Sequence, residues 1–221
     1  MKEKKLNLTA AVCAVLTILL IVLVRTADVA AIGPAGTKIG LSHLNQSVHE
    51  LTGVNMTWYD ITGWLGYLAI AIAVVLALLG CVQLIRRKSL KKVDREILCL
   101  GGLFVAVAVV YVFFEKVIVN YRPILMPDSM EPEASFPSSH TMITCAVMGG
   151  VMLVMGRYIK NKTLCTVLRA LCALVIAAMV AGRLVSGVHW FTDVIGGLLV
   201  SGALLSAFAG QLPPKENHSE N

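Results

Sequence analysis

Long apolar runs, separated by short polar segments, dominate the hydrophobic pattern of the chain. Six runs are visible, near residues 6–24, 64–85, 97–114, 141–155, 166–181 and 194–208. A helix needs about 20 apolar residues to cross the hydrocarbon core of a bilayer. The last three runs reach that length only if their helices continue into the flanking residues. The pattern predicts an all-α membrane protein with six transmembrane helices.

The composition supports this class. Hydrophobic residues make up 57% of the 221 residues and charged residues only 14%, whereas soluble domains carry about 25% charged residues. The first run resembles a signal peptide because lysines precede it. Its apolar stretch is longer than the apolar core of an ordinary signal peptide, and no small-residue cleavage site follows directly, so an uncleaved anchor is expected. The six cysteines lack Cys-x-x-Cys spacing and are interpreted as small apolar residues rather than a disulfide framework or a metal site.

Basic residues predict the orientation. They concentrate before the first run, between the second and third runs, around the connection between the fourth and fifth, and in the tail. In a six-span protein all of these lie on one side, which the positive-inside rule assigns to the cytoplasm together with both termini. The net charge of +6 thus reflects topology and contact with anionic lipid, and nucleic acid is not an expected partner.

The chain shows no internal repeat and no boundary between domains, so residues 1–221 are expected to form a single domain. The segment 26–63 is predicted to be an outer loop with an amphipathic helix, followed by aromatic residues at the membrane interface. The tail 211–221 is polar and is predicted to be disordered.

Residues 182–193 contain the first cluster of polar residues beside an apolar run. Arg183, His189 and Asp193 lie there, and ionisable groups in membranes are usually functional. A helix beginning nearby would place His189 and Asp193 on one face, where a carboxylate could activate an imidazole. Arg183 would suit phosphate oxygens. The alternative is an interfacial loop whose polar residues have only a structural role.

A second candidate segment covers residues 115–140. It contains Lys116, Arg122 before Pro123, and Ser138, Ser139 and His140 at the start of the fourth apolar run. One serine could cap that helix, whose free N–H groups would attract an anion. The alternatives are a simple helix cap with an incidental histidine, and a Lys116 side chain that extends to the membrane surface.

The six-span topology brings both segments to the same outer face. Cationic groups, a helix N-terminus, an imidazole held by a carboxylate and a second imidazole together indicate phosphoryl transfer.

The order Lys, Arg-Pro, then Pro-Ser-x-His, then Arg-(x)5-His-(x)3-Asp resembles the type-2 phosphatidic acid phosphatase superfamily, which includes membrane lipid phosphatases and soluble vanadium haloperoxidases. The resemblance covers residues 116–193. It implies that His189 attacks phosphorus to form a phosphohistidine, that Asp193 orients its ring, and that His140 protonates the leaving oxygen. It also implies that the reaction needs neither a metal nor another cofactor. Five residues are implied to bind the phosphate: Lys116, Arg122, Arg183, Ser138 and Ser139.

Three positions depart from the family pattern. Glu115 occupies the expected lysine position, one residue before Lys116. Ser139 replaces the usual glycine of the second motif, and Gly182 stands where a serine often precedes the arginine.

These features predict a metal-independent lipid phosphatase whose site opens at the outer leaflet of the cell membrane. Its partners would be the bilayer and a lipid phosphate or diphosphate, and the oligomeric state stays open. Candidate substrates are a polyprenyl diphosphate, phosphatidic acid and phosphatidylglycerol phosphate, with undecaprenyl diphosphate favoured because the compact chain resembles bacterial enzymes. The alternative, suggested by Glu115 and Gly182, is a non-catalytic binding or transport protein that keeps the fold.

Overall fold

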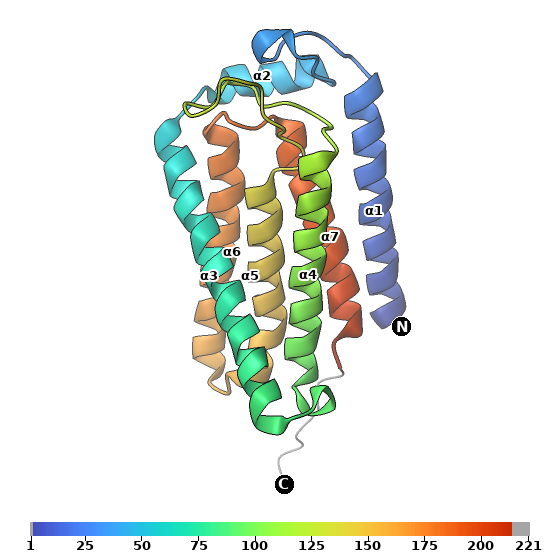
Figure 1. The fold of residues 1–221 in the computed structure, drawn as a ribbon, viewed down its shortest axis with the longest axis vertical. Helices are drawn as coiled ribbons and strands as arrows, with labels where there is room; N and C mark the ends of the chain where they lie inside the picture. The colour runs from blue at the N-terminus through green and yellow to red at the C-terminus, as the bar shows by residue number, and fades with distance from the viewer. Residues whose placement is uncertain (1, 214–221) are drawn as a thin grey trace.

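A computed structural model describes residues 2–213 of the chain (Figure 1). This part contains seven α-helices, two short 3₁₀ helices and no strand beyond isolated bridges in loops. Six helices are long and apolar enough to cross a membrane, which confirms the prediction of an all-α protein with six spans. The helices are α1 (Lys2–Thr26), η1 (Pro34–Gly36), α2 (Ser42–Thr52), α3 (Met56–Arg87), η2 (Leu90–Lys92), α4 (Arg95–Lys116), α5 (Ser139–Tyr158), α6 (Lys162–Val185) and α7 (Phe191–Gln211).

Each of the six long helices extends beyond its apolar run at both ends, as the length of the last three runs required. Asn55 and Asn161 cap α3 and α6 by accepting hydrogen bonds from Trp58 N and Leu164 N. Helix α2 lies within the outer loop. The predicted disordered tail falls mostly outside the described residues.

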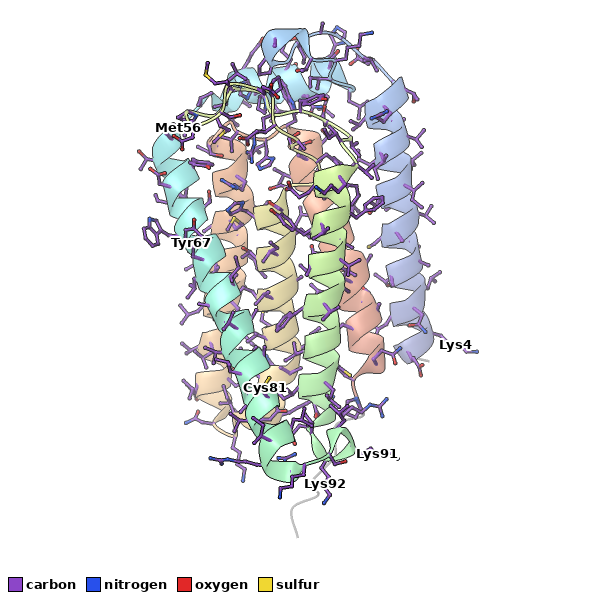
Figure 2. All side chains as sticks on the ribbon, in the orientation of Figure 1. Lys4, Met56, Tyr67, Cys81, Lys91 and Lys92 are labelled. Atoms are coloured by element: carbon purple, nitrogen blue, oxygen red, sulfur yellow. The ribbon has the colours of Figure 1, made fainter. Side chains whose placement is uncertain are left out.

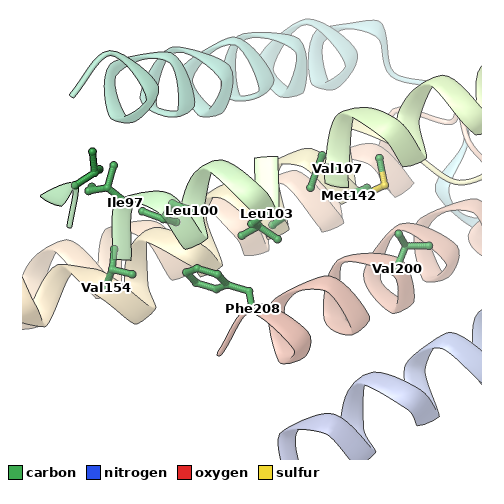
Figure 3. Close-up of a cluster of buried hydrophobic side chains, with 10 residues drawn as sticks. Ile97, Leu100, Leu103, Val107, Met142, Val154, Val200 and Phe208 are labelled. Carbon is green, nitrogen blue, oxygen red and sulfur yellow. The ribbon is translucent and has the colours of Figure 1, made fainter. Parts of the chain in front are cut away.

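Helix α5 occupies the centre of the bundle and packs against α3, α4, α6 and α7. In its most apolar window 56% of residues are buried, compared with 6% in α3. The core contains side chains from α4, α5 and α7, among them Leu100, Leu103, Met142 and Phe208 (Figure 3). The central position of α5 matters for function, because its N-terminus then lies among the other helices rather than in lipid.

Helix α1 packs along α7 at the edge of the bundle (Figure 1). A Cβ atom at Gly202 would lie 3.5 Å from the Cys13 sulfur, and one at Gly210 would lie 3.1 Å from Asn7 Oδ1. The two helices are therefore antiparallel, and α1 begins at the end of the bundle where α7 finishes.

The two ends of the bundle differ in chemistry. The start of α1 and the connection between α3 and α4 lie at one end, with Lys4, Lys91 and Lys92 (Figure 2). Helix α2, the loop 117–138, the starts of α5 and α7 and the end of α6 lie at the other (Figure 1). Both polar segments identified in the sequence are thus at one end of the molecule.

Candidate active site

His189 lies in the tight turn between α6 and α7. Gly187 has φ +67°, and a Cβ atom there would lie 2.2 Å from the backbone oxygen of Gly53. Only glycine allows this turn at this separation. Because α7 begins at Phe191, His189 precedes the helix, so the expectation that one helix carries both His189 and Asp193 is wrong.

Asp193 nevertheless faces His189 from the first turn of α7. The Nδ1 atom of His189 lies 3.7 Å from Asp193 Oδ2, too far for a hydrogen bond. Asp193 Oδ2 accepts a hydrogen bond from the Trp190 N–H at 2.9 Å, and Oδ1 accepts one from Asn120 Nδ2 at 3.3 Å. The carboxylate thus caps α7 and also stands behind the imidazole, a contact that often tightens when substrate binds.

The His189 ring is buried, and neither of its nitrogens has a hydrogen-bond partner among the described residues. Burial lowers the pKa of His189 well below 6.5, and the charges of Arg122 and Arg183 lower it further. The imidazole is therefore neutral and keeps a free lone pair. With Nδ1 facing Asp193, Nε2 is the nitrogen left for a ligand.

His140 projects from the first turn of α5 towards Arg183. Its Nδ1 lies 2.5 Å from Arg183 Nη2. A guanidinium only donates hydrogen bonds, so Nδ1 accepts and the ring proton sits on Nε2. A Cβ atom at Gly66 would lie 2.8 Å from His140 Cδ2, so glycine in α3 makes room for this ring. His140 is thereby held with a proton on the nitrogen opposite Arg183.

Arg183, in the last turn of α6, is fully buried. Its Nη1 donates to Thr62 Oγ1 at 3.2 Å, and its Cζ lies 5.1 Å from the centre of the Tyr59 ring. The Nε atom has no partner among the described residues. A buried guanidinium with an unused donor beside two histidines can receive an anion.

Gly182, which departs from the family pattern, has a packing role. A Cβ atom at this position would lie 2.5 Å from Thr62 Cγ2 and 2.9 Å from Trp58 Cε3. Any larger residue would push α6 away from α3 and displace Arg183. The absence of a serine hydroxyl here follows from the close approach of the two helices.

Arg122 reaches the site from the loop after α4. Its Nε donates to Glu133 Oε2 at 3.0 Å, and Nη1 donates to the Val188 carbonyl at 3.3 Å. Arg122, Ser139 and His189 line a cavity of ≈ 30 Å³, room for about one or two water molecules. Arg122 is thus paired with a carboxylate at the wall of this cavity.

The two serines of the second motif differ in their environment. Ser138 is buried, its N–H donates to the Asp193 carbonyl at 2.9 Å, and its Oγ accepts from Thr141 Oγ1 at 3.1 Å. It forms no side-chain cap on α5, so the expected serine cap is not made by Ser138. Ser139 lines the cavity and belongs to the first turn of α5, where backbone N–H groups have no partner within the helix.

Lys116 is exposed at the last residue of α4, and the cavity is lined by Glu115 instead. Of the five residues expected to bind phosphate, Arg122 and Ser139 line the cavity, whereas Lys116, Ser138 and Arg183 do not. Glu115 adds a negative charge near His189, which opposes binding of an anion.

We expect Lys116→Ala to change kcat/KM for a lipid phosphate by no more than about twofold, as for a solvated surface charge. Lys38→Ala is the matched control. Glu115→Gln should raise kcat/KM about threefold to tenfold, because it removes a carboxylate beside the anion. A large loss in Lys116→Ala alone would show that this lysine reaches the phosphate after a movement of the loop.

Sequence reasoning missed Asn120, Thr62 and Tyr59 as parts of the site. Asn120 stands two residues before Arg122, and this closeness in the sequence is the only feature that could have identified it as part of the site. Tyr59 and Thr62 lie in α3, within an aromatic stretch that was assigned to the membrane interface, and their contacts with Arg183 depend on helix packing. Among residues 2–213, no group of three or more His, Cys, Asp or Glu side chains could hold a metal ion.

The comparison with protein families decides the assignment. A family model described as the PAP2 superfamily matches residues 97–216, more than half of the chain. The chain belongs to the PAP2 superfamily. The match includes every one of the expected catalytic and phosphate-binding residues.

A solved structure supports the PAP2 fold. The chain is similar to the crystal structure of a transmembrane PAP2 type phosphatidylglycerolphosphate phosphatase from Bacillus subtilis, with a TM-score of 0.62 and 16% identity over 91% of this chain and 94% of that one. No curated protein matches the sequence. PAP2 membership and this fold support a membrane lipid phosphatase.

Proposed function

We propose that this protein removes a terminal phosphate from a membrane lipid through a phosphohistidine on His189, without a metal, at the outer leaflet. The carrying observation is the buried His189 ring, whose nitrogens have no partner among the described residues. Asp193 lies on one side of this ring, and Arg122 and Arg183 are close enough to lower its pKa. Such an arrangement fits a neutral nucleophile facing a dianion.

The first chemical step follows from the hydrogen-bond directions. His189 Nε2 attacks phosphorus as the bond between phosphorus and the lipid oxygen breaks. To act as an acid, His140 must carry a second proton on Nδ1, which requires Arg183 to turn from that nitrogen to the phosphate. The imidazolium then gives its Nε2 proton to the leaving oxygen and becomes neutral, and the lipid leaves as a neutral alcohol or as a lipid phosphate. Asp193 stabilises the positive charge on His189, and Arg122, Arg183 and the N–H groups at the start of α5 hold the phosphate oxygens.

In the second step water attacks the phosphohistidine. His140, now without its Nε2 proton, accepts a proton from this water, and the P–N bond breaks to release inorganic phosphate. His189 returns to its neutral form. The same imidazole thus acts as acid and then as base.

Substrate binding requires Arg122 to change its partner. Arg122 lines the cavity beside His189 and is paired with Glu133 at 3.0 Å. An incoming phosphate would replace Glu133 as the partner of Arg122. The lipid tail stays in the bilayer, and candidate substrates remain phosphatidic acid, phosphatidylglycerol phosphate and undecaprenyl diphosphate.

The outward orientation rests on the positive-inside rule, since the basic residues gather at the end opposite the site (Figure 2). A cysteine in place of Met130, which is exposed in the loop before α5, should react with an impermeant thiol reagent in intact cells. A cysteine in place of Lys91 should react only after lysis, once labelling of the native cysteines is subtracted. The reverse pattern would invert the topology.

Purified protein in detergent with EDTA should release inorganic phosphate from a lipid phosphate. This result separates an enzyme from a binding or transport protein that retains the fold, for which Glu115 beside the cavity is the motivating observation. Tight binding of the lipid without any release would favour the non-catalytic alternative, and loss of activity in EDTA that returns with a divalent metal would contradict metal independence.

The lowered pKa of His189 predicts the acid side of the pH profile. The nucleophile must be unprotonated, so its contribution to kcat/KM is lost only as the pH falls through the lowered pKa, below 6.5. Arg122→Gln removes one cause of the shift and should move this acid limb to higher pH, although it also weakens binding. The limb is measured with one substrate in both proteins, so that titration of the substrate phosphate cancels. An unchanged limb would show that His189 does not control it.

A further inference from the structure

A groove of ≈ 320 Å³ lies beside His140 on the outer part of α3. The α3 residues that line it are spaced three or four apart, so they form one face of the helix. His189 does not line this groove, and His140 does not line the smaller cavity beside His189. The two histidines thus face different spaces. The groove is lined by Tyr59, Asp60, Gly63, Trp64, Tyr67 and His140.

The groove is on the side of the leaving group. In an in-line displacement the nucleophile and the leaving oxygen stand on opposite sides of phosphorus. His189 approaches from one side, and His140, with its proton on Nε2, meets the leaving oxygen on the other. The part of the substrate attached to that oxygen therefore extends into the groove.

The lining of the groove suits a neutral, apolar leaving group. Trp64 and Tyr67 are 72% and 65% exposed, and their rings contact edge to face with centroids 5.8 Å apart. Aromatic rings of this kind are favoured where lipid meets water. They offer a surface for the first part of a lipid chain.

The same lining is unfavourable to a second phosphate. Asp60 contributes a carboxylate, and the residues that line the groove include neither lysine nor arginine. The nearby cation, Arg183, is fully buried and contacts the ring of Tyr59, with 5.1 Å between Cζ and the ring centre. Tyr59 lines the groove while Arg183 does not, so the guanidinium is not presented to the leaving group.

We propose that this groove, with Asp60 as its specificity-determining residue, makes the enzyme select lipid monophosphates over lipid diphosphates. The inference rests on the proposed function. A monophosphate releases a neutral alcohol into the groove. A diphosphate would place its second, anionic phosphate beside Asp60 without a cation to balance it, which costs binding and slows departure.

The test compares farnesyl phosphate with farnesyl diphosphate, which share one tail. Initial rates of phosphate release are measured for the purified protein in detergent with EDTA. The expected kcat/KM is at least about tenfold higher for the monophosphate. Asp60→Lys should reduce this ratio about tenfold by raising turnover of the diphosphate. Asp128→Lys, which makes the same charge change on an exposed loop residue, should leave the ratio unchanged.

Each result decides a different point. Equal or faster cleavage of the diphosphate by the wild-type protein overturns the selectivity, while phosphatase function stands. An Asp60→Lys ratio equal to that of the wild type, or the same change in Asp128→Lys, overturns the role of Asp60. Cleavage of neither lipid by monodisperse protein would contradict the proposed function, and the selectivity with it.

Discussion

His189→Ala is expected to lower kcat/KM for phosphate release by at least about a thousandfold, because no other side chain can form the phosphoenzyme. The ring is buried beside Asp193 with both nitrogens unpartnered among the described residues. The measurement is release of inorganic phosphate from a lipid phosphate by the purified variant. Rapid acid quenching would destroy a phosphohistidine, so the intermediate is trapped in alkali with labelled substrate and should appear in the wild type alone.

His43→Ala is the matched control. This histidine is exposed in α2 and pairs with Asp28 at 2.7 Å, at the same end of the molecule but away from the cavity. It should retain activity within about twofold. His189→Gln keeps a polar side chain of similar size and is the second variant. If its thermal unfolding matches the wild type, a loss of activity in it cannot be due to misfolding. Substantial turnover in both His189 variants would refute the assignment of the nucleophile.

Arg183→Ala is expected to reduce kcat/KM by about a hundredfold to a thousandfold. Arg183 is buried against Thr62 and Tyr59 and donates to His140. Its loss removes a charge from the phosphate site and also releases the ring that protonates the leaving oxygen. Arg183→Lys should recover only a small part of the activity, because an ammonium cannot reach His140 and the phosphate with the same planar geometry.

Arg157→Lys is the control for replacing a partly buried arginine. Arg157 pairs with Glu96 at 2.8 Å at the opposite end of the bundle, so its replacement should affect thermal unfolding more than kcat/KM. If Arg183→Lys were as active as the wild type, the planar fork would have no role in phosphate binding. If Arg183→Lys and Arg157→Lys lost activity equally and both unfolded at a lower temperature than the wild type, the loss of activity in Arg183→Lys would be structural.

The fold was largely predictable because the hydrophobicity of each segment is enough to predict whether it spans the membrane as a helix. The runs 97–114 and 194–208, for example, are apolar on all sides. In lipid, only a helix satisfies the hydrogen-bonding groups of such a backbone segment. The motif residues were also predictable as a set. Residues 115–140 and 182–193 had to meet at one end once the number of spans was known.

Local geometry was less predictable at the ends of helices. His189 was expected on a helix with Asp193, but the turn at Gly187 fits against Gly53, a residue far away in the sequence. One of Ser138 and Ser139 was expected to cap α5, and both were expected to bind phosphate. Ser138 makes no side-chain cap, its Oγ accepts a hydrogen bond from Thr141, and its N–H donates to the Asp193 carbonyl. In both cases a contact from another segment outweighs the local preference.

The amino-acid sequence by itself determined that this is a six-helix membrane protein with two histidines and two arginines gathered at one end. Hydrophobicity and the order of spans are sufficient for that, because the bilayer limits the choice of structure. Only the tertiary structure decided that Glu115 lines the cavity beside His189 and that Asp60 lines the groove beside His140. The position of Glu115 at the cavity and of Asp60 at the groove depends on the rotation of α4 and α3 about their axes, which is determined by side-chain packing between helices.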